Sequence, residues 1–274
     1  MTITVGFIGL GRLGSALARC LVEAGFAVVA FDIDPAAITA VPGLQSAPSP
    51  RQVAEAADVI CVAVMSEQQV LEMATGPNGL LAGVRPGTPV LVHSTISHDA
   101  LRRLVAMASA VEVPVLDAPV SGEQGHRSVP NLCVMVGGDA DAFARAQPVL
   151  HTFASLTVHL GPSGAGMDAK LSLNLLRYLG YLASQEAKHL ARSTGIAEAR
   201  FSALVEHSGA FRYTGTYESV FEEDLERREG NAATALKDLR AALSRAAEVG
   251  IPLPATEQSL ALVPTLWDLP AGDY

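Results

Sequence analysis

The sequence is poor in charged residues, in aromatic residues and in cysteine. Charged residues make up 17% of its 274 positions and aromatic residues 5%, whereas hydrophobic residues make up 49%. So little charge among so many apolar residues indicates a globular chain with a large buried core. Basic residues are also in the minority, because 19 Lys and Arg stand against 28 Asp and Glu, for a net charge of −9. We therefore expect no binding to nucleic acid and none to an anionic membrane surface.

The cysteines and histidines lack the spacings of disulfide frameworks and metal sites. Cys20, Cys61 and Cys133 lie in apolar contexts without a Cys-x-x-Cys motif, and the seven histidines show no ligand spacing. We expect buried, reduced thiols, a cytoplasmic location and no metal. The sequence also lacks an uncharged apolar run of about eighteen residues, and its N-terminus is typical of a strand rather than of a signal peptide.

Up to about residue 160, short apolar strands alternate with helical segments. The predicted strands cover residues 5–8, 28–31, 59–64, 90–93, 113–116, 133–136 and 156–160. The helical patterns between them cover residues 13–24, 50–57, 67–74, 99–109 and 140–150. The strands are nearly continuous apolar runs, as expected where helices cover both faces of a sheet. This alternation predicts an α/β fold with a doubly wound, Rossmann-type sheet.

Three glycines follow the first strand, at the spacing that a dinucleotide requires. Gly9 permits a tight turn, Gly11 lets the backbone approach a pyrophosphate, and Gly14 allows close helix–strand packing. The helix that begins here directs its amide N–H groups at the phosphates. Asp32 ends the second strand, where a carboxylate accepts a hydrogen bond from a ribose 2′-hydroxyl and repels a 2′-phosphate. We therefore expect NAD as the cofactor, ahead of NADP.

No convincing strand follows the glycine-rich segment at residues 161–166. Residues 167–193 form one long pattern with apolar positions nearly all round, which predicts a buried central helix. Further helices are predicted at residues 198–208, 217–228, 232–249 and 255–266. We expect a dinucleotide-binding domain over residues 1–160 and an all-helical substrate and dimerisation domain over residues 161–274.

Three later segments carry groups suited to substrate chemistry. Ser121 and Gly122 follow the carboxyl end of a strand and offer a hydroxyl and an N–H group to a carboxylate or carbonyl. Lys170 and Asn174 are four residues apart and share a helix face. Lys170 lies in the first turn of a mostly apolar helix, where burial requires a partner or a depressed pKa, and a depressed pKa suits a general acid or base. For Lys237, an exposed salt bridge and a role in the site are equally open.

In order along the chain, these segments resemble the β-hydroxyacid dehydrogenase family. That family includes 3-hydroxyisobutyrate dehydrogenase, tartronate semialdehyde reductase and, more distantly, 6-phosphogluconate dehydrogenase. The resemblance covers essentially the whole chain through five motifs, which are the glycine segment at 9–14, Ser94-Thr95-Ile96-Ser97, Asp-Ala-Pro-Val-Ser-Gly at 117–122, Gly-x-Gly-x-x-x-Lys-x-x-x-Asn at 164–174 and Lys-Asp-Leu at 237–239.

The resemblance implies a role for each group. It implies that Lys170 is the catalytic acid/base and that Asn174 is its positioning partner. It also implies that Ser121 and Gly122 hold the substrate carboxylate and that Lys237 closes the site. The remaining residues expected to bind the cofactor are Leu10, Arg12, Leu13, Val64, Met65 and, on the nicotinamide side, Thr95. The substrate is then a small hydroxy acid, and the helical domain is expected to form a homodimer or higher homo-oligomer, as in relatives.

The sequence departs from the family pattern at several positions. The loop at residues 123–130 lacks most of the family's glycines, and Glu123 follows the carboxylate clamp directly. An inward-pointing carboxylate there repels an anionic substrate, so we expect Glu123 to face solvent. Leu173 replaces an asparagine, and His93 and His98 replace an aspartate and a proline. These changes leave the reaction class in place and the substrate open.

Two other functions are alternatives to a hydroxyacid dehydrogenase. Imine reductases that use NADPH resemble this family in fold, but they usually lack the lysine and prefer basic residues after the second strand. Lys170 and Asp32 both argue against that reading. A catalytically inactive, nucleotide-binding regulatory protein is the other alternative, and the altered loop at residues 123–130 is the feature that favours it.

Overall fold

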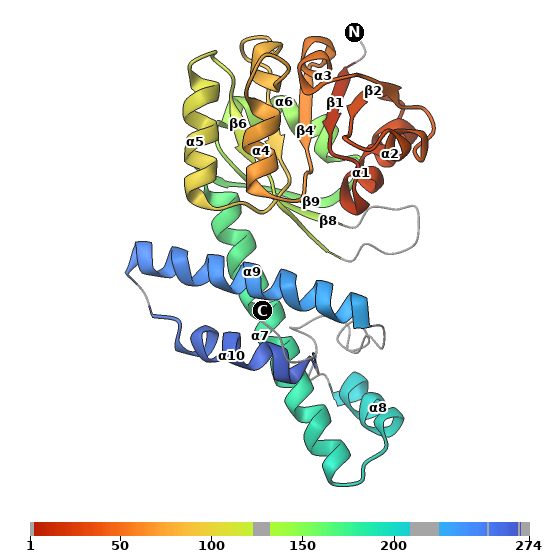
Figure 1. Cartoon of the computed structure of the whole chain (residues 1–274), viewed down its shortest axis with the longest axis vertical. Helices are drawn as coiled ribbons and strands as arrows, with labels where there is room; N and C mark the ends of the chain where they lie inside the picture. The colour runs from red at the N-terminus through yellow and green to blue at the C-terminus, as the bar shows by residue number, and fades with distance from the viewer. Residues whose placement is uncertain (1–2, 123–131, 209–224, 251, 268, 270–274) are drawn as a thin grey trace. The chain divides into compact units, whose positions relative to one another are not determined.

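The computed structural model describes residues 3–122, 132–208, 225–250, 252–267 and 269 (Figure 1). The chain forms two compact units, Met1–Lys170 and Leu171–Tyr274. The sequence predicts a domain boundary between residues 160 and 161. The two units divide ten residues later, between residues 170 and 171, inside the long helix at Ala165–Ser193. None of the described helices is both long enough and apolar enough to cross a membrane.

A nine-stranded sheet forms the centre of the N-terminal unit. The strands are β1 (Thr4–Ile8), β2 (Ala27–Phe31), β3 (Gln45–Ser46), β4 (Val59–Val62), β5 (Val90–Val92), β6 (Val115–Asp117), β7 (Val120–Ser121), β8 (Leu132–Gly137) and β9 (Ala154–Gly161). Their order is β3-β2-β1-β4-β5-β6-β8-β7, and β9 pairs with β8. The sheet is parallel from β3 to β6, after which β8 runs antiparallel to β6 and β7. The strand order reverses between β1 and β4, which is where doubly wound sheets bind dinucleotides.

Helices cover both faces of this sheet, as the apolar strands predict. They are α1 (Arg12–Glu23), α2 (Pro35–Thr39), α3 (Pro50–Ala56), α4 (Glu67–Ala74), α5 (His98–Ser109) and α6 (Ala140–Leu150), with a 3₁₀ turn at Leu80–Ala82. Alternate residues of β4 point to opposite faces, so that Val59 and Cys61 pack with α1 and α6, whereas Ile60 and Val62 pack with α3, α4 and α5. Figure 1 shows α4 and α5 next to each other over one face.

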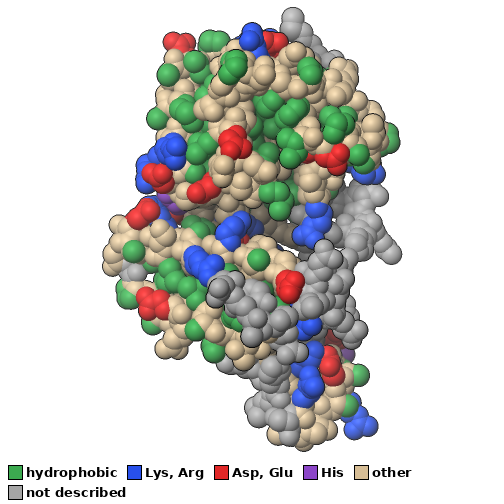
Figure 2. Space-filling view, viewed as in Figure 1, with side chains coloured by type: hydrophobic (Ala, Val, Ile, Leu, Met, Phe, Trp, Pro, Cys, Tyr) green, Lys and Arg blue, Asp and Glu red, His purple; other side chains and the backbone are tan. Residues whose placement is uncertain are grey.

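The surface of the N-terminal unit reflects the acidic composition. On the face that carries α4 and α5, green hydrophobic and red acidic side chains lie over the middle, and the blue Lys and Arg side chains lie mostly toward the margins (Figure 2). On this face, an anionic ligand would meet few positive side chains away from the margins.

The predicted α/β class is confirmed, and most element boundaries agree with the prediction to within two residues. Four short elements were missed, namely α2, β3, β7 and the 3₁₀ turn at Leu80–Ala82. Helix α2 is capped by Asp34, whose carboxylate accepts from the Ala36 N–H at 2.9 Å. Strand β7 forms because it pairs with β8. All four elements span five residues or fewer, too few for a hydrophobic period to be recognised.

The C-terminal unit is helical. Its helices are α7 (Ala165–Ser193), which begins in the N-terminal unit, α8 (Glu198–Ser208), α9 (Leu225–Val249) and α10 (Pro254–Leu266). A cluster of buried residues, which includes Tyr178, Leu236, Leu239, Val263 and Trp267, forms its core. Tyr178 thus packs in this core.

Two predictions for the helical unit were wrong. Gly230 does not separate two helices, since α9 runs through it from Leu225 to Val249. The earlier part of the helix predicted at 217–228 lies outside the described residues. The long helix α7 is not buried all round within one chain, because Leu173 and Leu176 are 40% and 62% exposed. Apolar composition alone does not show which side of a helix a neighbour covers.

Candidate active site

A cavity of about 470 Å³ lies at the carboxyl ends of β1, β2 and β4. Its walls include Gly9 and Gly11 after β1, Asp32 and Ile33 after β2, and Val64 after β4. This is the point at which the strand order reverses. The cavity therefore has the position and the backbone donors of a dinucleotide site.

The three glycines of this loop meet different surroundings. Gly9 has φ +90°, and a Cβ there would lie 2.7 Å from the Ala63 carbonyl oxygen. A Cβ at Gly14 would collide with the Gly9 carbonyl oxygen, so the helix can pack this closely only without a side chain. A Cβ at Gly11 would meet nothing within 4 Å. Protein packing does not require Gly11, and its bare backbone fits the approach of a pyrophosphate.

Asp32 holds the glycine loop in place. One carboxylate oxygen accepts from the Leu10 N–H at 2.5 Å and the other from the Asp34 N–H at 2.8 Å. Each oxygen keeps a further lone pair, and the side chain lines the cavity. Asp32 therefore fixes the glycine loop and still presents acceptor lone pairs at the cavity wall.

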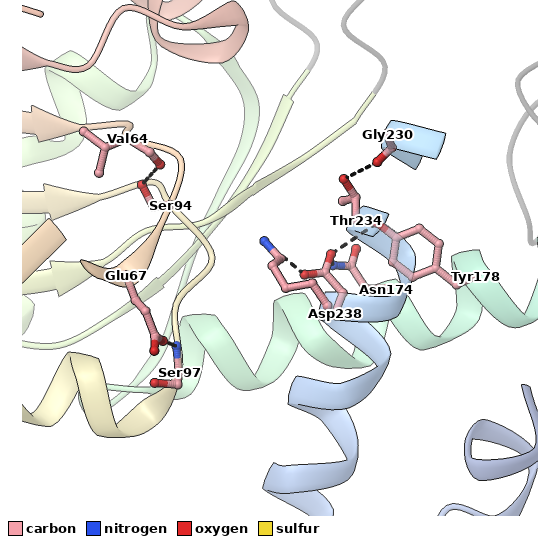
Figure 3. Close-up of polar contacts among 10 residues, drawn as sticks. Val64, Glu67, Ser94, Ser97, Asn174, Tyr178, Gly230, Thr234 and Asp238 are labelled. Carbon is pink, nitrogen blue, oxygen red and sulfur yellow. Dashed lines mark hydrogen bonds and ion pairs between the residues drawn. The ribbon is translucent and has the colours of Figure 1, made fainter. Parts of the chain in front are cut away.

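The other residues expected at the cofactor differ in exposure. Leu10 is buried and Leu13 is partly buried against the core, whereas Arg12 is exposed at the start of α1. Met65 is 85% exposed and, like Val64, lines the cavity. The Ser94 hydroxyl donates to the Val64 carbonyl oxygen at 2.7 Å (Figure 3), which ties the segment after β5, including the half-buried Thr95, to the segment after β4.

Ser97, in the same motif, begins helix α5. Its hydroxyl accepts from the Ala100 N–H at 3.2 Å, and its own N–H donates to a Glu67 carboxylate oxygen at 3.1 Å (Figure 3). The helix cap and the link to α4 account for Ser97 without a role in chemistry.

Ser121 and Lys170 each have a separate link to Cys133. Ser121, half-buried in β7, lies directly opposite Cys133 of β8 in the antiparallel pair. Burial raises the pKa of the Cys133 thiol, and the charge of Lys170 acts on the same thiol in the opposite direction. The N-terminal unit thus brings the half-buried lysine near the strand pair that carries Ser121. Gly122 follows Ser121 with φ +142° and is exposed. Glu123 and the loop at residues 123–130 lie outside the described residues.

Asp117 fixes the start of the helix that carries Lys170. Its fully buried carboxylate accepts from the Gly164 N–H at 2.8 Å and from the Met167 N–H at 2.9 Å. A Cβ at Gly166 would lie 2.7 Å from the Asp117 carbonyl oxygen, so the chain passes here at close range. Asp117 begins the motif that contains Ser121, but its own role could not be predicted from the sequence.

The two histidines that depart from the family pattern have separate structural partners. His98 pairs through Nε2 with an Asp168 carboxylate oxygen at 3.0 Å, two residues before Lys170. His93 is buried, and its Nδ1 lies 2.8 Å from the Ala118 carbonyl oxygen. Burial lowers the pKa of His93 to about 4, so the ring is neutral at neutral pH. No cluster of three potential metal ligands occurs among the residues that the structure describes.

In the helical unit, a buried carboxylate receives two side chains of α7 (Figure 3). Asp238 of α9 accepts from Asn174 Nδ2 at 2.8 Å and from the Tyr178 hydroxyl at 3.2 Å, both at Oδ2. The Lys237 ammonium lies 3.4 Å from Asp238 Oδ1, and the lysine side chain is 54% exposed. Lys237 is therefore an exposed ion-pair partner in this structure. Asp238 belongs to the Lys-Asp-Leu motif at residues 237–239, but its role could not be predicted from the sequence.

A doubly wound sheet with a glycine-rich loop beside the reversal of its strand order defines a dinucleotide-binding protein. The family model for the NAD binding domain of 6-phosphogluconate dehydrogenase matches residues 4–161. The chain is 33% identical over 270 residues to an uncharacterized oxidoreductase of Mycobacterium tuberculosis, covering 94% of this chain and 91% of that protein. It is 36% identical over 207 residues to 3-hydroxyisobutyrate dehydrogenase of Pseudomonas aeruginosa, covering 74% and 69%.

Solved structures agree with these sequence matches. The structure of M. tuberculosis 3-hydroxyisobutyrate dehydrogenase with L-serine superposes with a TM-score of 0.80 at 28% identity and covers 97% of this chain and 94% of that one. An imine reductase from Pseudomonas sp. shares the fold at only 18% identity, with a TM-score of 0.69. The chain therefore belongs to the β-hydroxyacid dehydrogenase family and is an NAD(P)-dependent hydroxyacid dehydrogenase.

Proposed function

We propose that this protein oxidises the hydroxyl group of a small β-hydroxy acid with NAD, and that Lys170 is the general acid/base. The main support is the placement of Lys170. A half-buried lysine at the start of α7 lies near the strand pair that carries Ser121, and Asn174 follows one turn later on the same helix. The Lys170 amine, the Ser121 hydroxyl and the exposed Gly122 N–H together suit a substrate that bears both a carboxylate and a hydroxyl.

Each residue then has one task. The Ser121 hydroxyl and the Gly122 N–H bind the substrate carboxylate. Neutral Lys170 accepts the hydroxyl proton at Nζ in oxidation, and its ammonium form returns a proton to the alkoxide in reduction. Gly9, Gly11 and Asp32 would hold NAD, which would supply the hydride acceptor. Asp117 and Met167 support this arrangement because they anchor the first turn of α7 in the N-terminal unit.

The preference for NAD over NADP rests on the charge of the cavity walls. Asp32 and Glu72 both line the cavity, and no Lys or Arg is among the described residues that do so. Ile33, which follows Asp32, is 83% exposed and offers no positive charge. A 2′-phosphate would meet a carboxylate without a compensating cation.

The test is a panel of small β-hydroxy acids with NAD or NADP, followed at 340 nm. Lys170→Ala should lower kcat by a factor of about 10²–10⁴, the range for loss of a general acid/base. Lys188→Ala is the matched control, because Lys188 is another lysine of α7 and pairs with Glu198 at 2.6 Å. Near-normal turnover in Lys170→Ala would remove Lys170 from its role. Turnover only of imines with NADPH, or tight NAD binding without any turnover, would favour the two alternative functions.

The exposed apolar residues of α7 support assembly through the helical unit. Leu173 and Leu176 are 40% and 62% exposed, although leucine is usually buried. We propose that a second subunit covers this part of α7, and light scattering should give a mass of at least two chains. A monomer mass at micromolar concentration would contradict this.

A further inference from the structure

The side-chain amide of Asn174 is held in one orientation by Asp238. The two side chains lie 2.8 Å apart, from Asn174 Nδ2 to Asp238 Oδ2, and both residues are at least 95% buried. An ionised carboxylate only accepts hydrogen bonds, so the NH₂ group of the amide must face it. The carbonyl oxygen of Asn174 is then the atom that remains for other partners.

This orientation matters because Lys170 stands one turn before Asn174 on the continuous helix α7. Residues four apart on a helix lie on the same face. A carbonyl oxygen accepts a hydrogen bond from a lysine ammonium or from a substrate hydroxyl, whereas an NH₂ group would repel the ammonium. We propose that Asp238 is a positioning residue, which fixes the Asn174 amide with its oxygen available to the acid/base chemistry. This inference rests on the proposed role of Lys170.

The surroundings of Asp238 are built to keep it as an acceptor. Tyr178 donates to the same oxygen at 3.2 Å, and burial, together with the charge of Asp238, raises the pKa of its phenol, so the donor stays protonated. The other oxygen, Oδ1, has no hydrogen-bond partner among the described residues, but the Lys237 ammonium lies 3.4 Å away. Lys237 thus supplies charge to the carboxylate without competing for the oxygen that holds Asn174.

If Asp238 had only a structural role, its substitution would lower kcat whether or not Asn174 is present. A double-mutant cycle with Asn174 distinguishes this role from positioning. Asp238→Asn keeps the shape of the side chain but can present an NH₂ group, so the Asn174 amide is free to reverse. We expect kcat to fall about tenfold or more, with KM for NAD changed less than about twofold. In an Asn174→Ala background the same substitution should have no further effect on kcat, because Asp238 acts through Asn174. An equal loss of kcat in both backgrounds would overturn the proposal.

Two further variants separate positioning from stability. Tyr178→Phe removes the other donor to Asp238 Oδ2 and leaves the Asn174 bond in place, so it should lower Tm but spare most of kcat. Thr234→Ala is a neutral control on α9, because Thr234 is exposed and its hydroxyl donates to the Gly230 carbonyl oxygen, at 2.8 Å (Figure 3). Parallel losses of kcat and Tm in Asp238→Asn and Tyr178→Phe would show a structural role and overturn the inference.

The orientation of the Asn174 amide can also be tested without measuring turnover. If the wild-type protein binds NADH but oxidises no hydroxy acid, the proposed function fails, and the positioning bond is then tested by NMR. The side-chain ¹⁵N–¹H₂ signals of Asn174, assigned by their loss in Asn174→Ala, should shift in Asp238→Asn and stay in place in Thr234→Ala. Signals that do not move in Asp238→Asn would show that Asp238 does not hold the amide.

Discussion

Gly14 and Gly230 both lie inside helices, but a methyl group at the two positions would meet different surroundings. At Gly14, in the N-terminal unit, it would collide with the Gly9 carbonyl oxygen and lie 3.2 Å from the Phe7 ring. At Gly230, in the helical unit, it would meet nothing within 4 Å. In the N-terminal unit, the glycine loop therefore depends on close backbone packing, which is possible because Gly14 has no side chain.

The helical unit builds its polar centre in another way. There the Asp238 carboxylate collects donors from Asn174 and Tyr178, all three of which are buried. Pairs of side chains from separate helices set the geometry, and helical backbone groups are already satisfied within each helix. Substitutions should therefore act through backbone fit and burial in the N-terminal unit, and through side-chain pairing in the helical unit.

The largest expected effect concerns the buried His93 of the N-terminal unit. Its pKa is lowered to about 4 by burial, against about 6.5 in an unfolded chain, so the unfolded state binds more protons between these values. Stability should be highest above about pH 6.5 and fall as the pH drops toward 4, by on the order of 3 kcal/mol at most. Urea unfolding at several pH values measures this slope.

The control for His93 is a substitution that keeps the hydrogen bond but does not titrate. His93→Asn offers an N–H group to the Ala118 carbonyl oxygen and should flatten the slope in this range. An equal slope in the wild type and in His93→Asn would show that His93 is not the group responsible.

The next effect concerns the glycine loop itself. Gly14→Ala should destabilise the protein by about 2 kcal/mol or more, because the clash involves backbone atoms that cannot rotate away. Gly11→Ala should leave Tm nearly unchanged, because its Cβ has open space, yet it should weaken NADH binding about tenfold or more. Thermal unfolding and NADH fluorescence titration separate the two. A Gly11→Ala protein that binds NADH normally would mean that the pyrophosphate does not approach this position.

The two units also differ in how far the sequence predicts them. The buried parallel strands are short apolar runs bounded by turns, so β1, β4 and β5 were found at nearly their observed bounds, and Gly9, Gly14 and Asp32 were recognised by their spacing. The partner of Asn174 was not found, because Asp238 lies 64 residues away and pairing between helices has no local period. Gly230 was misread for a related reason. An exposed glycine costs a helix only about 1 kcal/mol, which neighbouring turns and packing can outweigh.

A smaller effect should follow from the charge of Asp32. Asp32→Asn keeps an oxygen for the Leu10 N–H but removes the repulsion of a 2′-phosphate. We expect the preference for NAD over NADP, as a ratio of kcat/KM values, to narrow about tenfold. Asp34→Asn is the matched control, because Asp34 caps α2 and is not part of the cavity wall. A ratio that does not change in Asp32→Asn would show that this carboxylate does not face the ribose.

The smallest effect returns to the glycine of the helical unit and has the opposite sign from Gly14. Gly230 lies within α9, has no positive φ, and leaves open space where a Cβ would be. Alanine there restricts the unfolded chain and exposes less helix backbone, so Gly230→Ala should stabilise the protein by about 0.5–1 kcal/mol. Urea unfolding measures the change, and kcat should stay as it is because Gly230 touches no group of the site. Destabilisation by Gly230→Ala would show that this glycine, like Gly14, packs closely against a neighbour. Because a Cβ at Gly230 meets nothing within 4 Å in the single chain, that neighbour would have to be a second subunit.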